Sequence, residues 1–396
     1  MKKVLFIIGS GATYGLSVKM RNSPLNFSPT DQGFWEKLGE DKCLSYIEPN
    51  FPALTYFLKF MDLWNFKILK LHSLESIWNL VDVIFKHLNY SKNYKSDPIY
   101  KINKKDFDEI LRFLSCYRDN YYNGKYIGEK KMQFSKYFID IYNAENNQLE
   151  KETLLTGLAG WDLRNLIAAL FSVDCENFSF NEKLVNTIFN KKILEILNGI
   201  VTFNYDVFLE KYLLSKKMEF YYPHSNDKHL NSSICITKLH GSLNWKHNYD
   251  GCIEVSSNNL QTCEQGFRDV NAIESFQQCA IISPVIFKQE LNFPDSNRRL
   301  YRTFSKIWQC AAEKIYNSTH IVMYGYGFPK GDYYLDSFFK FYIKKKKDIK
   351  IANINIENSN TNEFNQRINM IFGTNPFFID IAKEDLIEEK LNSFLR

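Results

Sequence analysis

Two short polar segments contain the residue types that could carry out chemistry. Thr202-Phe203-Asn204-Tyr205-Asp206 places an amide and a carboxylate after an apolar run, and Lys238-Leu239-His240-Gly241-Ser242 places a histidine beside a glycine. An amide can hold a hydroxyl group or a water molecule, and histidine can accept a proton near neutral pH. Taken alone, the first segment is more typical of an Asx-turn that closes a strand, and a lone histidine is more often structural than catalytic.

A glycine-rich segment, Gly9-Ser10-Gly11-Ala12-Thr13, follows directly after the apolar run 3–8. Glycines allow the backbone to approach phosphates, and free N–H groups at the start of the next helix can bind them. The spacing differs from the dinucleotide-binding G-x-G-x-x-G pattern, because Tyr14 stands where the third glycine would be. The segment therefore predicts either a nucleotide-binding loop or a tight strand-to-helix corner.

The apolar runs that precede these segments predict the scaffold that positions them. We expect strands at 3–8, 200–203, 234–239, 280–282, 320–324 and 349–356, and a helix over about 298–316. Strands that alternate with helices favour an α/β fold with a Rossmann-like, doubly wound parallel sheet. Polar or glycine-bearing residues follow these strands, Ser283-Pro284 among them, and such sheets bind ligands outside the carboxyl ends of their strands. A shared crevice is therefore expected for Gly11, Asn204 and His240.

Residues from about 51 to 197 show helical spacing instead of strand patterns. Leu184, Ile188, Ile193 and Leu197 belong to one such series, and Gly199 supplies a stop signal. We therefore expect a discontinuous Rossmann-like core at 1–35 and 199–396, interrupted by an all-helical insertion at 36–198.

Charge and cysteine usage exclude several classes of protein. The 50 basic and 45 acidic residues give a net charge of +5, which is too balanced for nucleic acid as the main ligand. The 8 cysteines form no CxxC pair, which argues against a zinc ribbon, and they are too few for a disulfide framework. The Walker A, GxSxG and HExxH motifs are absent. No apolar run approaches the length of a membrane span, so we expect a soluble, cytoplasmic protein.

Taken together and in this order, the motifs resemble the sirtuin family, and more closely the bacterial SIR2-like proteins of antiphage defence. Those proteins carry a G-x-G-A-S/T loop after the first strand, then T-x-N-Y/I-D, K-L-H-G-S-x-N-W and G-Y-S-x-P-x-x-D segments. The matching stretches here are Gly9–Thr13, Thr202–Asp206, Lys238–Trp245 and Gly325–Pro329 with Asp332. The resemblance covers residues 1–35 and 199–380 and leaves the expected helical insertion uncovered.

The resemblance implies that the protein binds NAD as a substrate. It assigns the NAD phosphates to the loop residues Gly9, Ser10, Gly11, Ala12 and Thr13. Asn204 would hold the ribose of the nicotinamide half, and Asp206 would contact the carboxamide. His240 would act as general base on a ribose hydroxyl or a water molecule.

On the adenosine side, the resemblance places Gly325 and Tyr326 near the ribose and phosphates, and Asn355 near the adenine. Gly327 stands where the family prefers serine, so one phosphate or ribose contact would be missing. The cysteine-based zinc module of deacetylating sirtuins is absent from the sequence, so no zinc is expected and peptide deacetylation is disfavoured.

The resemblance implies an NAD glycohydrolase that cleaves the nicotinamide–ribose bond to nicotinamide and ADP-ribose and acts as an abortive-infection effector. Such an enzyme would need gating, through a homo-oligomer or through a partner such as a HerA-type ATPase. Two alternatives stay open. One is an NAD-dependent protein deacylase, and the other is a non-enzymatic module that binds NAD or ADP-ribose as a sensor.

Overall fold

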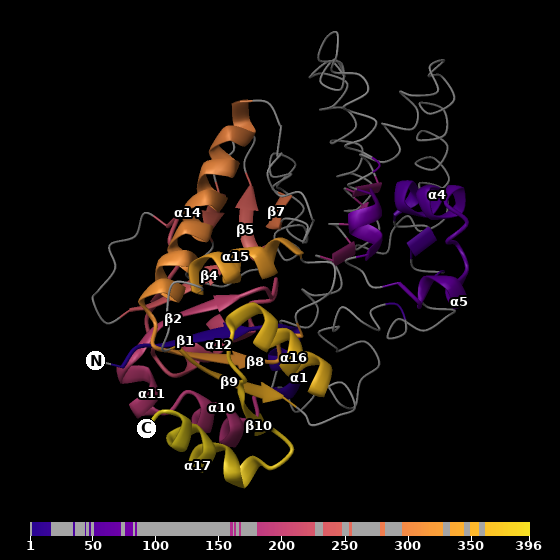
Figure 1. The fold of residues 1–396 in the computed structure, drawn as a ribbon. Helices are drawn as coiled ribbons and strands as arrows, with labels where there is room; N and C mark the ends of the chain where they lie inside the picture. Colours follow the sequence, from indigo (N-terminus) through magenta and orange to yellow (C-terminus); the bar gives the residue numbers. More distant parts are fainter. Residues whose placement is uncertain are drawn as a thin grey trace. The chain divides into compact units, whose positions relative to one another are not determined.

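A computed structural model gives the fold of the chain (Figure 1). It describes residues 2–16, 35, 44, 47–48, 51–72, 76–81, 84, 159–160, 162–163, 166–167, 180–225, 233–247, 253–255, 278–281, 295–327, 333–343, 349–355 and 361–396. The chain divides into two compact units. The first comprises Met1–Thr30, Val173–Leu260 and Cys279–Arg396, and the second comprises Asp31–Ser172 and Gln261–Gln278.

The first unit is built on a seven-stranded sheet in which every strand runs parallel to its neighbours (Figure 1). The order across the sheet is β10-β9-β8-β1-β2-β4-β3. The bounds are β1 Val4–Ile8, β2 Leu197–Thr202, β3 Phe220–Tyr221, β4 Ile234–Lys238, β8 His320–Tyr324, β9 Lys350–Asn355 and β10 Phe377–Asp380. The predicted doubly wound parallel sheet is therefore confirmed, with β1 at its centre.

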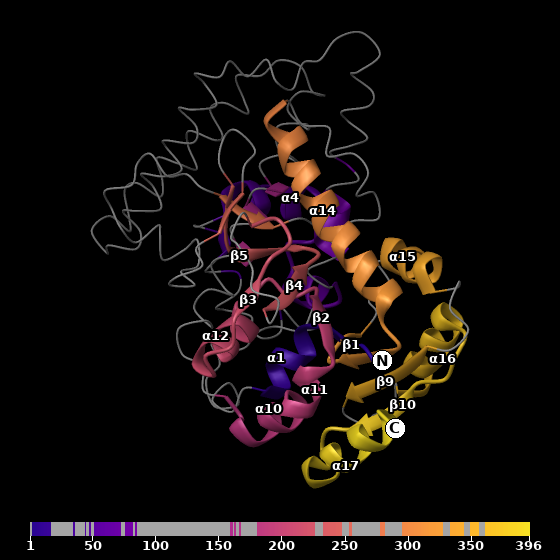
Figure 2. The same ribbon diagram turned by 90° about the vertical axis from the view of Figure 1, so that its left-hand side faces the viewer.

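Helices cover both faces of this sheet, because parallel strands need crossover connections. One face carries α1 (Ser10–Leu16), α10 (Glu182–Ile188), α11 (Lys191–Glu195) and α12 (Phe208–Ser215), and the other carries α14 (Asp295–Asn317), α15 (Tyr333–Ile343) and α16 (Thr361–Phe372) (Figure 2). The C-terminal α17 (Glu384–Phe394) packs against α10 and β10. Helices α10 and α11 precede the expected boundary at residue 199, and the division into units places them with the sheet.

The local sequence explains both the central strand and the helices beside it. Val4–Ile8 is apolar throughout and at most 5% exposed at any position, as expected for a parallel strand that is covered on both faces. Asn181 and Asn190 start α10 and α11, because their side chains accept hydrogen bonds from the backbone N–H groups of Leu184 and Ile193. The second cap divides one apolar helical pattern into two short helices.

The structure corrects two of the expected elements. The strand expected at 280–282 is β7 (Gln278–Ile281), which belongs to a separate three-stranded sheet with β5 (Gly241–His247) and β6 (Ile253–Val255). Ser283-Pro284 lies outside the described residues, and the strand before it is not part of the large sheet. Leu197 starts β2 and is not helical. A short apolar run indicates that a strand forms, but it does not specify the sheet that the strand joins.

In the second unit, the regular structure among the described residues between 31 and 172 is helical, including α4 (Pro52–Phe60) and α5 (Phe66–Leu69). Asp162 Oδ2 accepts a hydrogen bond of 3.0 Å from the Leu54 N–H group in the first turn of α4. This bond satisfies one of the N–H groups that a helix start leaves without an intrahelical partner. The bounds 36–198 of the expected insertion stay a prediction. None of the described helices has the length and apolar character needed to cross a membrane.

Phe6→Ala should destabilise the protein much more than Phe377→Ala. Phe6 is 0% exposed in the central strand, whereas Phe377 is 39% exposed on the edge strand β10. Truncation of a buried phenylalanine costs about 3–5 kcal/mol, and truncation at an exposed site typically costs about 1 kcal/mol or less. Denaturant unfolding of both variants would measure the difference, and equal losses would contradict the central position of β1.

Candidate functional site

The strand register aligns the carboxyl ends of five strands at one edge of the large sheet. Adjacent strands place in one row the residues Lys238, Thr202, Ile8, Tyr324 and Ile354. The residues that follow them in the chain are Leu239, Phe203, Gly9, Gly325 and Asn355. The glycine loop and the segments with Asn204, His240 and Gly325 therefore share this edge, as the sequence predicts.

The loop after β1 packs directly against the loop after β8. Gly9 N donates to Tyr324 O at 3.0 Å, and Gly11 N donates to Gly325 O at 2.9 Å. Gly325 has a φ of +58°, and a Cβ there would lie 1.9 Å from Ala12 N. The chain order reverses between β1 and β8, which makes this the topological switch point where α/β sheets bind ligands. Glycine is thus required here by contact between two backbones.

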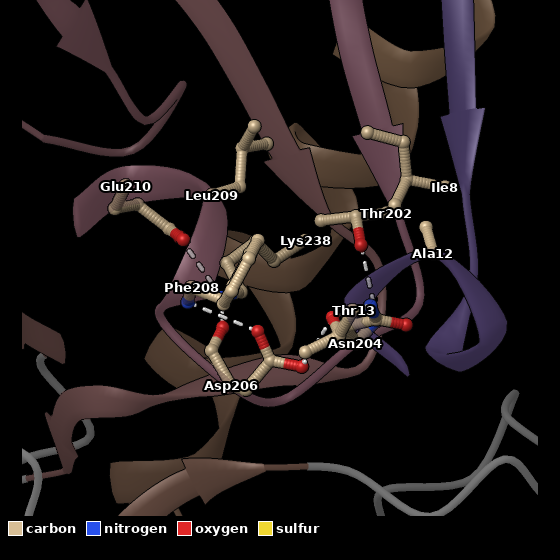
Figure 3. A pocket seen from close by; sticks show the side chains of 10 residues that line it. All are labelled: Ile8, Ala12, Thr13, Thr202, Asn204, Asp206, Phe208, Leu209, Glu210 and Lys238. Atoms are coloured by element: carbon tan, nitrogen blue, oxygen red, sulfur yellow. Dashed lines mark hydrogen bonds and ion pairs between the residues drawn. The ribbon is translucent and has the colours of Figure 1, made fainter. Parts of the chain in front are cut away.

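Asn204 fastens the glycine loop to the end of β2 (Figure 3). Its Nδ2 donates to Gly9 O at 3.0 Å and to Thr13 Oγ1 at 2.9 Å. A carbonyl oxygen can only accept, so the atom that faces Gly9 O must be the amide nitrogen. The Asn204 backbone N–H donates to Thr202 Oγ1 at 3.1 Å, which helps to fix the residue. The structure therefore brings Asn204, Gly9 and Thr13 together.

Thr13 continues this chain of hydrogen bonds to Asp206. Thr13 Oγ1 donates to Asp206 Oδ2 at 3.0 Å, and the Phe208 N–H group donates to Asp206 Oδ1 at 3.0 Å. The second bond forms an Asx-turn at the start of α12. The sequence of segment 202–206, taken alone, is typical of such a turn. Burial raises the pKa of Asp206, while Lys238 and the bond from Phe208 oppose the shift. Both carboxylate oxygens accept bonds from the protein, and contact with a carboxamide stays a prediction.

His240 follows β4, and its buried ring packs against the two aromatic residues that flank Asn204. The ring centroid lies 5.4 Å from that of Phe203 and 6.0 Å from that of Tyr205. The backbone segments are also bonded, because Leu243 N donates to Tyr205 O at 3.0 Å. The segments that carry the two predicted catalytic residues therefore form one packed unit.

A buried ion pair stabilises these packed segments. Lys238 Nζ donates to Asp206 O and, at 2.9 Å, to Glu210 Oε1, and the side chains of the pair are 1% and 2% exposed. A buried charge is tolerated only when it is paired and hydrogen-bonded. Glu210 Oε1 also accepts from Tyr222 Oη at 2.9 Å. The ammonium group therefore joins the end of β4 to the loop after β2 and to α12.

The network continues to the segment after His240. Asn244 Nδ2 donates to Tyr222 Oη at 3.3 Å, and Ser242 Oγ donates to Asn244 Oδ1 at 2.6 Å. Burial raises the pKa of Tyr222 well above its usual value, so its hydroxyl keeps the proton that it donates. Sequence reasoning assigned no role to Lys238 or Glu210. The signal that could have indicated this pair is the position of Lys238 and of Glu210 among apolar residues of β4 and α12.

The remaining predicted site residues lie at the same edge. Tyr326 stacks on Phe203 with ring centroids 4.3 Å apart and an interplanar angle of 20°. Asn355 ends β9, two strands away from β1, and its carbonyl accepts from Ile381 N at 3.0 Å. Ser10 is the first residue of α1. The adenosine contacts of Tyr326 and Asn355 stay predictions.

The space beneath the glycine loop is small. A cavity of about 10 Å³ lies there, and its lining includes Ala12, Thr13, Asn204, Asp206 and Lys238 (Figure 3). That volume suits about one water molecule. The N–H group of Ala12 already donates to the carbonyl of the first loop glycine at 2.9 Å. The polar groups around this cavity are hydrogen-bonded to one another, and the cavity is too small for a dinucleotide.

Residues 198–365 match the family model described as the SIR2-like domain. This segment is similar to SIR2-like domains. It carries Asn204, His240, Gly325 and Tyr326, and SIR2-like domains bind NAD. The loop Gly9–Thr13 precedes the matched segment in the chain and is bonded to it through the contacts described above.

A search of curated proteins gives no match to the chain. Within the ranges that the structure describes, no group of three or more His, Cys, Asp or Glu side chains could hold a metal ion.

Gly325→Ala should disrupt the carboxyl edge of the sheet, whereas Gly327→Ala should be tolerated. The first substitution forces a Cβ against Ala12 N at a positive φ, while a Cβ on Gly327 would meet nothing within 4 Å. We expect the melting temperature to fall by roughly 5 °C or more for Gly325→Ala, from about 1–3 kcal/mol of backbone strain and additional clash. Differential scanning calorimetry compares the two, and the contact would be refuted by equal melting temperatures.

Lys238→Met should lower the free energy of unfolding by about 3–5 kcal/mol, because the Glu210 carboxylate would stay buried without its cation. Lys238→Met combined with Glu210→Leu should recover a large part of that loss, since both charges are then removed. Urea unfolding of the two single variants and the double variant gives the coupling energy. Strictly additive losses would show that the two side chains do not interact.

Proposed function

We propose that this protein hydrolyses NAD at the nicotinamide–ribose bond and releases nicotinamide and ADP-ribose. The observation that carries the proposal is that Asn204, His240 and the glycine loop lie together at the carboxyl edge of the sheet, next to the topological switch point between β1 and β8. The similarity of residues 198–365 to SIR2-like domains supports NAD as the ligand. The reaction passes through an oxocarbenium-like state, so the protein must hold the ribose, let nicotinamide leave and present a water molecule.

NAD would lie across the outer side of the carboxyl edge, because the cavity beneath the loop holds about one water molecule. The glycine loop, Gly325 and Tyr326 lie at this edge, and the Tyr326 ring is held by stacking on Phe203.

Asn204 would act on the ribose through Oδ1. Its Nδ2 is engaged by Gly9 O and Thr13 Oγ1, so the carbonyl oxygen is the atom that remains to accept from a ribose hydroxyl. The same side chain would then fix the glycine loop and orient the sugar. This dual role couples the position of the phosphates to the position of the reacting carbon.

His240 would accept a proton from the attacking water molecule or from a ribose hydroxyl. Its ring packs against Phe203 and Tyr205, which are neighbours of Asn204 in the chain. Lys238 would serve as a positioning residue, because it holds Asp206 O and so fixes the end of the same segment.

We also propose that NAD hydrolysis serves antiphage defence and is gated, through a homo-oligomer or a partner such as a HerA-type ATPase. The support is the ordered resemblance of the motifs at Gly9, Asn204, His240 and Gly325 to the bacterial defence proteins. Gating is the consequence of the chemistry, since unrestrained hydrolysis would deplete NAD in the host cell.

His240→Ala should lower the rate of NAD hydrolysis by roughly 10²–10⁴-fold, the usual contribution of a general base, while NAD binding persists. Asn204→Ala should weaken both binding and turnover, because it releases the loop as well as the ribose. Nicotinamide and ADP-ribose are measured by chromatography with mass spectrometry, and NAD binding is measured by calorimetry.

Asn375→Ala, at an exposed position before β10, is the matched control and should keep full turnover. The assays use the protein alone, with cell lysate and with neighbouring-gene products, each with and without an acetyl-lysine peptide. Nicotinamide release that requires the peptide would identify a deacylase. NAD binding without turnover in all conditions would identify a sensor, and either result overturns the hydrolase proposal.

A further inference from the structure

Two cysteines meet on the face of the sheet opposite to Lys238. Cys235 lies in β4 and Cys310 in α14, and their Sγ atoms are 3.6 Å apart although 75 residues separate them in the chain. Side chains alternate across a strand, so Cys235 faces the α14 side while Lys238, at an odd spacing, faces α12. The fold, and not the local sequence, creates this pair of thiols.

The surroundings of the pair favour one thiolate. The hydrogen bond from Cys310, then Lys314, and then a hydrogen bond from Tyr221 lower the pKa of Cys235 to about 7, against the effect of burial. The same contact raises the pKa of Cys310, which keeps the proton that the two sulfurs share. The stem of Lys314 runs over Gly199, where an added Cβ would lie 3.3 Å from Lys314 Cδ and 3.2 Å from Cys235 O.

We propose that Cys235 and Cys310 form an oxidation site at which hydrogen peroxide produces a reversible intramolecular disulfide. Cys235 is buried, whereas Cys310 is only partly covered, so an oxidant little larger than water can reach the pair from the side of Cys310. The two sulfurs are already in van der Waals contact and one is poised to ionise near neutral pH. This inference does not depend on the proposed hydrolysis of NAD.

The chemistry balances with peroxide as the only co-reactant. The Cys235 thiolate attacks one peroxide oxygen, the O–O bond breaks, and Cys235 becomes a sulfenic acid while hydroxide leaves. The Cys310 sulfur then attacks the sulfenic sulfur, the S–S bond forms, and the second oxygen leaves as water with the Cys310 proton. The hydroxide takes up the proton that Cys235 released on ionisation. Two thiols and one peroxide thus give one disulfide and two water molecules.

Closure requires a modest movement. A disulfide has an S–S length of about 2.05 Å, so the sulfurs must approach by roughly 1.5 Å, and α14 already packs against β4. The bond would fasten α14 to the strand whose end carries Lys238 and precedes His240. It would also constrain the unfolded chain over a long loop, which stabilises the folded protein.

Peptide mapping of the native full-length chain tests the proposal. Reduced protein is treated with hydrogen peroxide near neutral pH, remaining thiols are alkylated, and a digest is analysed by mass spectrometry. We expect a peptide pair linked through Cys235 and Cys310 that disappears after treatment with dithiothreitol. The linked protein should melt roughly 5 °C or more above the reduced form.

The two single variants distinguish the attacking thiol from the resolving one. Cys310→Ser should leave a sulfenic acid on Cys235 that dimedone traps, whereas Cys235→Ser should give neither a cross-link nor rapid labelling of Cys310. The proposal is wrong if peroxide leaves both thiols open to alkylation, or if the cross-link forms only in urea. Both readouts are independent of NAD turnover, so failure of the hydrolase proposal would not affect them.

Discussion

The buried ammonium group of Lys238 is the constraint on which the geometry of this edge depends. An ion removed from water must be matched by charge and hydrogen bonds, and Lys238 finds them in the Glu210 carboxylate and the Asp206 carbonyl. Those partners lie on α12 and on the loop after β2, so neither element can shift without exposing an uncompensated charge. The same carboxylate holds Tyr222, whose hydroxyl accepts from Asn244. The Lys238 charge thus connects, through Glu210 and Tyr222, the segments that precede and follow β4 in the chain.

The glycine contact at the switch point adds the third segment. Gly9 and Gly11 bond to the backbone at the end of β8, and Asn204 and Thr13 bond the same loop to the segment after β2. Hydrogen bonds therefore connect the ends of β1, β2 and β8 to one another. The glycines of this loop are explained first by contact between protein backbones, since a Cβ at Gly9 would lie 2.6 Å and a Cβ at Gly11 2.9 Å from Gly325 O. Close approach of a phosphate is compatible with this packing but is not needed to account for it.

The sequence could predict this edge because the parallel register is simple. Apolar runs end where polar motifs begin, and aligned strands bring such ends together, so the sequence alone places Gly9, Asn204, His240 and Gly325 in one group. It could not show that Lys238 and Glu210 pair, because the pairing depends on the pleat of β4 meeting α12. It also could not assign β7 to the small sheet, since strand pairing is a long-range choice. Likewise, the sequence alone does not distinguish an Asp206 that forms an Asx-turn from an Asp206 that contacts the carboxamide of NAD.

The bonding of Asn204 determines how any loss of activity at that residue should be interpreted. Its amide nitrogen holds Gly9 and Thr13, so removal of the side chain frees the loop even if Asn204 never touches a substrate. His240 differs, because its ring packs against Phe203 and Tyr205, whereas the amide of Asn204 is bonded to the glycine loop itself. A loss of turnover at His240 with the fold and NAD binding intact is therefore evidence about chemistry. The same loss at Asn204 is evidence about chemistry only when the loop is shown to stay in place.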